Sequence, residues 1–251
     1  MLLNIQGMNP TCQNQAYKIK ALDEIIKNSP NFVPYIAITE SHLNEGVFNA
    51  EVHLEGYNIY RADRVKRKSG GASIYMHEEI IVNEQKIFSD SVCEAVMLKN
   101  NHLNFILISL YKPPDANDLD SSFKKCTETM NDFIKTFGEG SDIMVLGDFN
   151  LPNINWNTLE VKKSRSAQEK NCAKTLLNFL DKHLLVQLVE ETTRKDKNTL
   201  DLILTNNQEP VHNIVVEKTK LSDHDIVHLF MLNSFGKHKT DDNITIEEDR
   251  F

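Results

Sequence analysis

The sequence has few of the residues that cross-link a fold or hold a structural metal. Its 251 residues contain four cysteines, Cys12, Cys93, Cys126 and Cys172, with no CxxC pair and no dense spacing among them. Neither a zinc site nor a disulfide scaffold is predicted, and a reducing compartment fits this cysteine usage best.

Long apolar runs are also missing. No segment approaches the roughly 20 apolar residues that a membrane-spanning helix needs, and residues 1–6 carry no basic flank typical of a secretion signal. We therefore expect an intracellular protein of the nucleus or the cytoplasm, which is not secreted and has no membrane partner.

Positive charge is in deficit, with 28 Lys and Arg against 36 Asp and Glu and a formal net charge of −8. Such a chain does not hold nucleic acid through its overall charge, so any phosphate contact must come from local basic clusters. Three clusters stand in expected loops, at residues 61–68, 162–165 and 194–197. A run of charges more often marks a solvated face, and that interpretation stays open.

What the sequence does contain is enough apolar residues, 40%, for one large core. Three amphipathic stretches predict helices at residues 15–27, 120–137 and 167–184. Strands are predicted at residues 2–6, 35–39, 57–61, 72–76, 93–98, 105–110, 143–146, 200–204, 214–217 and 226–230. Because many consecutive strands have no helix between them, we predict an α/β sandwich of mixed sheets over residues 1–234, followed by a polar tail at 235–251.

A carboxylate and an amide follow the apolar run 143–146. In Gly147-Asp148-Phe149-Asn150 they lie on the same side of an extended backbone, because side chains alternate along a strand. Such a pair can orient one water, with Asp148 accepting its proton and Asn150 binding an oxyanion. An Asx turn that closes a strand explains the motif about equally well.

Other acids stand at strand ends or beside a histidine. Carboxylates next to His224 would keep it protonated near neutral pH and able to stabilise a phosphate, although an exposed turn at Asp223-His224 is the simpler interpretation. Asp201 interrupts the apolar run 199–204 and needs a partner there, which is His224 or backbone amides. Glu40 ends an apolar strand and is either a hard oxygen ligand for Mg²⁺ or a solvated acid.

Taken in order, seven fragments resemble the endonuclease/exonuclease/phosphatase superfamily, which includes DNase I and the apurinic/apyrimidinic endonucleases. The resemblance is closest to the endonuclease domain of jockey-like non-LTR retrotransposons. The fragments are Leu3-Asn4-Ile5-Gln6-Gly7, Ile38-Thr39-Glu40-Ser41, Gly70-Gly71-Ala72, Leu110-Tyr111-Lys112-Pro113-Pro114, Gly147-Asp148-Phe149-Asn150-Leu151-Pro152, Thr199-Leu200-Asp201-Leu202 and Ser222-Asp223-His224. Each fragment is weak alone, but seven in the order of the family form a specific pattern.

The resemblance implies a DNase I-like, four-layered α/β sandwich in which two packed mixed sheets are flanked by helices. It also implies a Mg²⁺ cofactor, for which Mn²⁺ could substitute. Glu40 would be the principal metal ligand, with Asn4 and Asp223 close to the metal. Repair-type relatives have an acid where this chain has Gln6, so one metal ion is expected here and not two.

The implied activity is that of a metal-dependent endonuclease that nicks DNA and leaves a 3′-hydroxyl. Asp148 would activate the attacking water, and Asn150 and Tyr111 would hold the phosphate. Asp201 would orient His224, which would stabilise the charge that develops on the phosphate.

DNA is the expected partner, contacted through Arg61, Arg67, Lys68 and Arg194. The chain would act as a monomer, and a reverse transcriptase would have to be encoded elsewhere, since no such region follows within these residues. Two alternatives stay open at this stage. One is a degenerate domain that binds DNA or protein without catalysis, and the other is a phosphoesterase of the same superfamily acting on abasic DNA or another phosphodiester.

Overall fold

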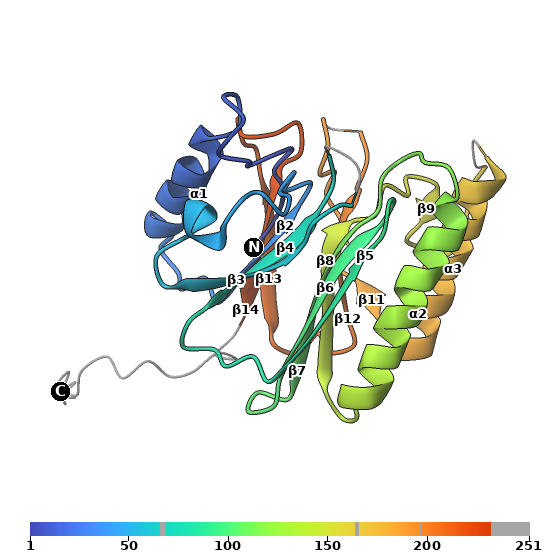
Figure 1. Cartoon of the computed structure of the whole chain (residues 1–251). Coiled ribbons are helices and arrows are strands. Elements are labelled where there is room, and N and C mark those ends of the chain that lie inside the picture. The colour runs from blue at the N-terminus through green and yellow to red at the C-terminus, as the bar shows by residue number, and fades with distance from the viewer. Residues whose placement is uncertain (66–68, 164–165, 196, 232–251) are drawn as a thin grey trace, which may run out of the picture.

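The computed structural model describes residues 1–65, 69–163, 166–195 and 197–231. Two six-stranded sheets lie face to face, with one helix outside the first sheet and two helices outside the second (Figure 1). The predicted four-layered α/β sandwich is thus confirmed. The expected tail at 235–251 lies outside the described residues, as do Arg67 and Lys68.

Each sheet mixes parallel and antiparallel strands. The first has the order β13 (Val211–Glu217), β14 (Ile226–Met231), β1 (Leu2–Asn4), β2 (Tyr35–Thr39), β4 (Ala72–His77) and β3 (Tyr57–Ala62). The second has the order β11 (Val186–Gln187), β12 (Asp201–Thr205), β8 (Asp142–Asp148), β7 (Phe105–Tyr111), β6 (Glu94–Asn100) and β5 (Glu84–Ser89). A short hairpin joins β9 (Ile154–Asn155) to β10 (Glu160–Val161).

One parallel pair stands near the centre of each sheet, and a helix connects its two strands. The helix α1 (Tyr17–Lys27) lies between β1 and β2, and α2 (Leu119–Phe137) lies between β7 and β8. Because parallel strands end at the same edge, Asn4 and the residue after Thr39 share one edge, and Tyr111 and Asp148 share another. The loops that follow these ends gather along the top of Figure 1.

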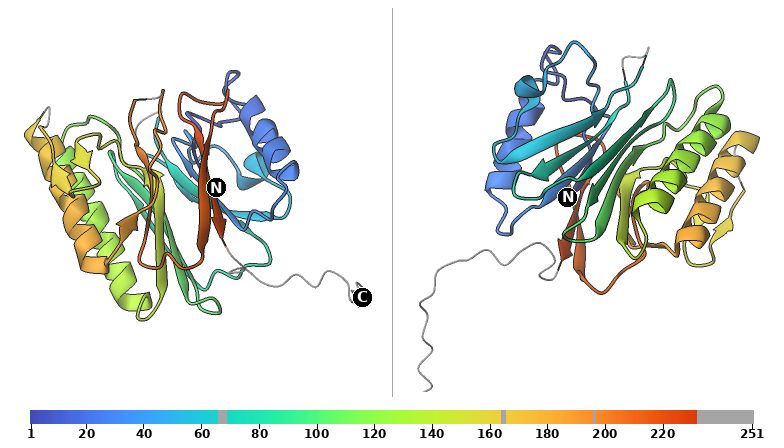
Figure 2. Two further views of the ribbon diagram at one scale, coloured as in Figure 1. Left: turned by 180° about the vertical axis from the view of Figure 1, so that it is seen from behind. Right: turned by 60° about the horizontal axis from the view of Figure 1, so that its bottom comes forward.

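The helices cover the sheets through apolar stripes. On α2, Phe123, Cys126, Met130 and Phe133 recur at helical spacing and are buried against the second sheet. The helix α3 (Ala167–His183) packs beside α2 on the same outer face, as both views in Figure 2 show. Its start is stabilised by the Ser166 hydroxyl, which accepts a hydrogen bond from the Glu169 N–H at 3.1 Å.

Three apolar clusters hold the four layers together. One lies between the second sheet and its two helices, a second fills the space between the sheets, and a third joins the first sheet to α1 and the 3₁₀ helix η1 (Asn49–Val52). All four cysteines are free thiols, and three of them are buried in or beside this core, as the absence of a disulfide framework predicts. None of the helices in the described part of the chain combines the length and apolar character needed to cross a bilayer.

All ten predicted strands occur, with ends that differ by at most a few residues, and all three helices occur as well. The sequence analysis missed β5, β9, β10 and β11. The longest of these, β5, is an edge strand whose first four residues are exposed, so its sequence lacks the apolar alternation by which a half-buried strand is recognised.

Gly147 sits in β8 opposite Leu110, at a point where the backbones approach too closely for a side chain. A Cβ at this position would stand 2.0 Å from the carbonyl oxygen of Leu110. We expect Gly147→Ala to lower the free energy of unfolding by about 3 kcal/mol or more, because backbone and not a flexible side chain must move. Urea denaturation measures this loss. Gly46→Ala is the matched control and should be nearly neutral, since its Cβ would meet only the Asn44 side chain, at 3.1 Å.

Candidate active site

A row of polar side chains crosses the end of the second sheet. Glu94 on β6 stands opposite Tyr111 on β7, Tyr111 stands beside Asp148 on β8, and Asp148 stands opposite Asp201 on β12. Cross-strand neighbours point to the same face of a sheet, so the four residues form one line, and each is buried. This line faces the first sheet, because Asp148 contacts a residue of β1.

Asn4, at the end of β1, joins the acids of the two sheets. Its Nδ2 donates to Glu40 Oε1 at 2.9 Å and to Asp148 Oδ2 at 2.8 Å. Glu40 follows β2 with a left-handed backbone (φ 51°), which is uncommon for this residue type. The strained backbone brings its carboxylate to the side chain of Asn4. Three residues predicted as site residues are thereby brought together.

Asp201 and His224 form the pair that the sequence predicts. His224 Nδ1 lies 2.7 Å from Asp201 Oδ2, and both side chains are almost fully buried. Thr193 holds the backbone at this point, because its hydroxyl accepts from the N–H groups of Leu200 and Asp201 at 3.1 Å. Nearby Asp148 completes a group of three whose possible ligand atoms lie within 4.8 Å of one another.

Asp223 lies at the rim of this group and is surrounded by donors. Arg194 and Lys195 approach its Oδ2 at 3.1 and 3.0 Å, and Gln6 Nε2 donates to its Oδ1. Burial opposes ionisation, but Lys195 and Arg194 outweigh it and lower the pKa of Asp223. The amide at Gln6 therefore complements Asp223 in a way that a second acid at this position could not. The predicted metal role of Asp223 stays a prediction.

Asn150 is held by a neighbouring strand end. Its Nδ2 donates to the carbonyl oxygen of Lys112 at 3.0 Å, and its backbone N–H donates to Asp148 Oδ1 at 3.0 Å. The buried Lys112 ammonium in turn donates to the carbonyl oxygens of Pro113 and Asn150, at 2.9 and 3.5 Å. The Asx turn considered in the sequence analysis is thus present, and it places the side chain of Asn150 next to Asp148.

The site concentrates negative charge in a buried place. Burial, with the neighbouring Asp201 and Glu40, raises the pKa of Asp148 to about 8 against the opposing effect of His224. Burial likewise raises the pKa of Tyr111, with Glu40 and Asp148 adding to it. For Glu40, hydrogen bonds from His42 and Asn4 outweigh burial and lower the pKa.

A divalent cation fits this arrangement by the chemistry of the donors. Glu40, Asp148 and Asp201 offer carboxylate oxygens, the ligands that Mg²⁺ prefers. Asp201 Oδ1 is buried and has no hydrogen-bond partner among the described residues. Two positions are compatible with the contacts. One is beside Glu40 and Asn4, as the sequence predicts, and the other is within the group Asp148, Asp201 and His224. We favour the first because His224 Nδ1 already bonds to Asp201.

The residues predicted to contact DNA have different surroundings. Arg61 is fully engaged, since its guanidinium contacts Asp63, the carbonyl oxygens of Val47 and Asn44, and Asn49. Its side chain is 11% exposed, whereas that of Arg194 is 36% exposed at the rim. Arg67 and Lys68 lie outside the described residues. Contact with DNA stays a prediction for all four.

Two buried groups near the site were missed in the sequence analysis. Arg64 and Glu94 form an ion pair with both side chains at most 4% exposed. Glu94 interrupts the apolar run 92–98 as Asp201 interrupts its own run, so the same signal could have identified it. Lys18 was also missed; it is buried and its ammonium donates to the carbonyl oxygens of Ile5 and Gln6, at 2.6 and 3.1 Å.

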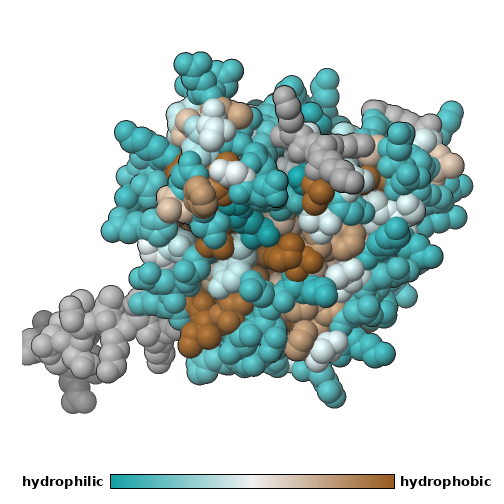
Figure 3. Space-filling view, viewed as in Figure 1, coloured by the Kyte–Doolittle hydropathy of each residue, from teal (hydrophilic) through white to brown (hydrophobic). Residues whose placement is uncertain are grey.

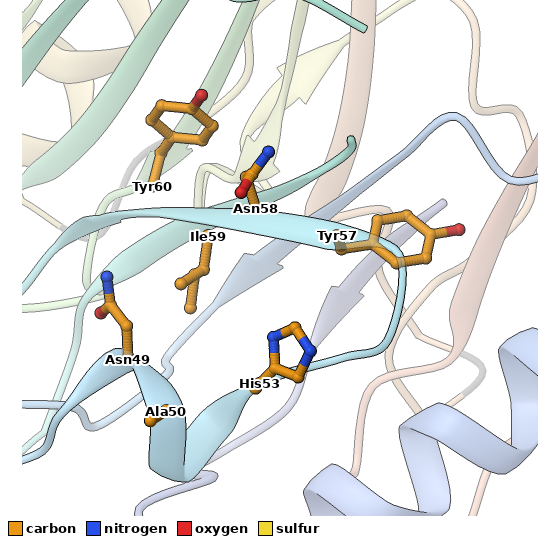
Figure 4. Close-up of a pocket in the computed structure, with 7 residues that line it drawn as sticks. All are labelled: Asn49, Ala50, His53, Tyr57, Asn58, Ile59 and Tyr60. Carbon is orange, nitrogen blue, oxygen red and sulfur yellow. The ribbon is translucent and has the colours of Figure 1, made fainter. Parts of the chain in front are cut away.

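A separate hollow of about 510 Å³ lies between η1 and β3, lined by Asn49, Ala50, His53, Tyr57, Asn58, Ile59 and Tyr60 (Figure 4). None of these seven residues belongs to the group around Asp148. On the face seen in Figure 3, apolar residues form separate small patches among hydrophilic ones. Neither the hollow nor these patches is as well suited to catalysis as the polar residues around Asp148.

The two facing sheets and the helices outside them define a DNase I-like α/β sandwich. The family model described as endonuclease-reverse transcriptase matches residues 105–228, slightly less than half of the chain. This stretch runs from β7 into β14 and includes Tyr111, Asp148, Asp201 and His224. The resemblance predicted from the sequence is thereby confirmed over this stretch of the chain.

Solved structures with a similar fold include proteins from three different sources. The 3′-5′ exonuclease NExo of Neisseria meningitidis has a TM-score of 0.65 and 15% identity, covering 92% of this chain and 98% of its own. The AP endonuclease LMAP of Leishmania major has a TM-score of 0.61 and 12% identity, covering 92% of this chain and 86% of its own. The endonuclease domain of TRAS1, a telomere-specific non-LTR retrotransposon, has a TM-score of 0.56 and 14% identity, covering 92% of this chain and 96% of its own. At these identities the likeness concerns the fold. No curated protein matches the chain significantly.

Proposed function

We propose that this protein is a divalent-metal-dependent endonuclease that hydrolyses phosphodiester bonds of DNA and leaves a nick with a 3′-hydroxyl. One observation carries the proposal. Glu40, Asn4 and Asp148 meet beside the Asp201–His224 pair, although these five residues come from five separate parts of the chain. Burying so many ionisable groups together is costly to a fold. Such clusters are typical of active sites.

Each residue has a role that its contacts support. Asp148 in its ionised form accepts the proton of the attacking water, and because its pKa is raised, the share of this form grows as the pH rises. Tyr111 and Asn150, which both neighbour Asp148, hold the phosphate. His224, kept protonated by Asp201, stabilises the charge that develops on the phosphate oxygens. A cation held by Glu40 and Asn4 supplies further neutralisation of that charge.

DNA is the proposed substrate because one similar structure was solved with DNA bound and others are named as nucleases. The Neisseria enzyme was solved as a 3′ phosphatase bound to a product DNA hairpin, and the TRAS1 domain is an endonuclease of a retrotransposon. The family model joins an endonuclease to a reverse transcriptase. Arg194, half-exposed at the rim and next to Asp223, is proposed to contact a DNA phosphate.

A plasmid assay tests the proposed function. With Mg²⁺, the wild-type protein is expected to convert supercoiled plasmid to the relaxed form, and EDTA should abolish this conversion. A DNA polymerase should extend the nicks without prior end treatment, because they carry a 3′-hydroxyl. An oligonucleotide duplex with one abasic site, compared with the intact duplex, distinguishes general nicking from repair-type incision.

Two results would contradict the proposal. Retention of plasmid on the protein in a gel, with no relaxation in either Mg²⁺ or Mn²⁺, would favour a degenerate binding domain. Relaxation that persists at full rate in EDTA would exclude a role for a divalent cation.

A further inference from the structure

We infer that Arg64 and Glu94 are positioning residues for Tyr111 and set the place of its hydroxyl in the site. The inference deepens the proposed function and rests on it for the role of the hydroxyl. The geometry of the pair itself is independent of that function.

The pair is bidentate and enclosed. Arg64 Nε lies 2.6 Å from Glu94 Oε1, and Arg64 Nη2 lies 2.9 Å from Glu94 Oε2. The same Nη2 donates to the carbonyl oxygen of Val92 at 2.5 Å, and the N–H of Gly71 donates to Glu94 Oε2 at 3.1 Å. Charged groups of this kind hold one another in a narrow range of orientations, because the planar guanidinium matches the carboxylate.

Both members contact or flank Tyr111. The guanidinium carbon of Arg64 lies 5.2 Å from the centre of the Tyr111 ring, within the range of a cation–π contact. Glu94 is the cross-strand neighbour of Tyr111 in the register of β6 and β7. The Tyr111 hydroxyl interacts with Glu40. Tyr111 therefore contacts both the ion pair and an acid of the site.

The pair also joins the two sheets at the rim. Arg64 follows β3 of the first sheet, whereas Glu94 begins β6 of the second. The Arg64 guanidinium packs against Gly70, where no side chain fits, since a Cβ at Gly70 (φ +103°) would stand 2.3 Å from Arg64 Cζ. The ion pair thus connects the edge of the first sheet, where Glu40 lies, with the edge of the second sheet, where Tyr111 lies.

Stability alone gives no reason for an ion pair here. Replacing a buried ion pair by apolar residues of similar volume is often neutral or stabilising, because desolvation offsets the attraction. What the ion pair adds over an apolar contact is a fixed orientation of the groups that touch it. A ring held in one direction presents its hydroxyl to the same point, and this is what a group holding a phosphate requires.

Arg61 and Asp63 offer a matched control pair. They form a charged pair two residues apart in the sequence, just before Arg64, with side chains 11% and 23% exposed. Their described contacts are with the segment 44–49 and with Ser89, and not with Tyr111. A variant of this pair disturbs a charge near the same loop without touching the ring.

A double-mutant cycle in the full chain tests the inference. We expect Glu94→Gln to lower kcat of plasmid nicking about tenfold with KM unchanged, and Tyr111→Phe to lower it by a similar factor. The two together should be no slower than Tyr111→Phe alone, because both remove the same contribution. Asp63→Asn should retain the wild-type kcat. Additive losses, or an unchanged kcat in Glu94→Gln, would overturn the inference.

A spectroscopic readout keeps the test independent of activity. In protein labelled with ring-¹³C tyrosine, the Tyr111 resonance is assigned by its loss in Tyr111→Phe. It is expected to shift in Glu94→Gln and to stay in place in Asp63→Asn. If Glu94→Gln does not fold, Arg64→Lys serves instead, since it keeps the charge and loses the bidentate contact. An unmoved resonance refutes the positioning role, whereas a shifted resonance in a protein that does not nick refutes only the proposed function.

Discussion

Asp148→Asn is expected to lower the rate of plasmid nicking at least ~100-fold, the usual scale for removing a general base. The substitution keeps the shape of the side chain but removes its ability to accept a proton from water. It also changes only one of the contacts of Asn4, which still donates to Glu40. His224→Ala should cause a loss of the same order, through the charge on the phosphate. Single-turnover nicking at fixed Mg²⁺ measures both.

The stability of the variant separates this effect from misfolding. Burial beside Asp201 and Glu40 raises the pKa of Asp148 to about 8, so the ionised carboxylate is disfavoured in the folded protein at neutral pH. A neutral amide removes that cost, and Tm should be equal or higher than in the wild type. Asp142→Asn, at the other end of β8, is the control and should nick normally. Normal nicking by Asp148→Asn would mean that the base is another group or that the activity is a contaminant.

The sheet strands that the sequence predicts best are those with apolar side chains on both faces. The strands β2 and β7 are buried throughout, and β8 is buried after its first residue. Their short apolar runs bounded by polar residues were found within one or two residues of their ends. The strand β5 was missed because its exposed first half has no apolar pattern to detect. Burial, and not strand propensity, made the difference.

The polar groups at strand ends were predicted for a related reason. Acids such as Glu40 and Asp148 stand out because apolar residues precede them, and the order of the fragments carried the resemblance. Their neighbours in space could not be predicted, since pairing across sheets depends on the register of strands far apart in sequence. Gln6 illustrates this point: the sequence shows only a missing acid, whereas the structure shows an amide that donates to Asp223.

The use of arginines was the least predictable feature. Arg61 looks like part of a basic cluster, yet the carbonyl oxygens of Val47 and Asn44 occupy its guanidinium. Arg64, from the same cluster, is buried against Glu94. A count of charges in a segment says nothing about which of them face solvent, because a partner 30 residues away can bury one of them.

Glu40→Gln is expected to weaken binding of the cation and, with it, to reduce nicking at least ~100-fold at low Mg²⁺. An amide offers one neutral oxygen where the carboxylate offers two that share a charge, so the electrostatic attraction falls. Because the lost contribution is binding, raising Mg²⁺ should restore part of the rate. Titration with Mn²⁺, followed by its electron paramagnetic resonance signal, measures the affinity without relying on activity.

The same titration decides between the two cation positions. Glu45→Gln, on the exposed loop after Glu40, is the control and should bind Mn²⁺ as the wild type does. Asp201→Asn should leave the affinity nearly unchanged if Asp201 acts through His224, with which it forms the 2.7 Å contact. If instead Asp201→Asn abolishes Mn²⁺ binding and Glu40→Gln does not, the cation belongs with Asp148, Asp201 and His224. His224 would then be a ligand, and the stabilising charge assigned to it would have to come from the cation.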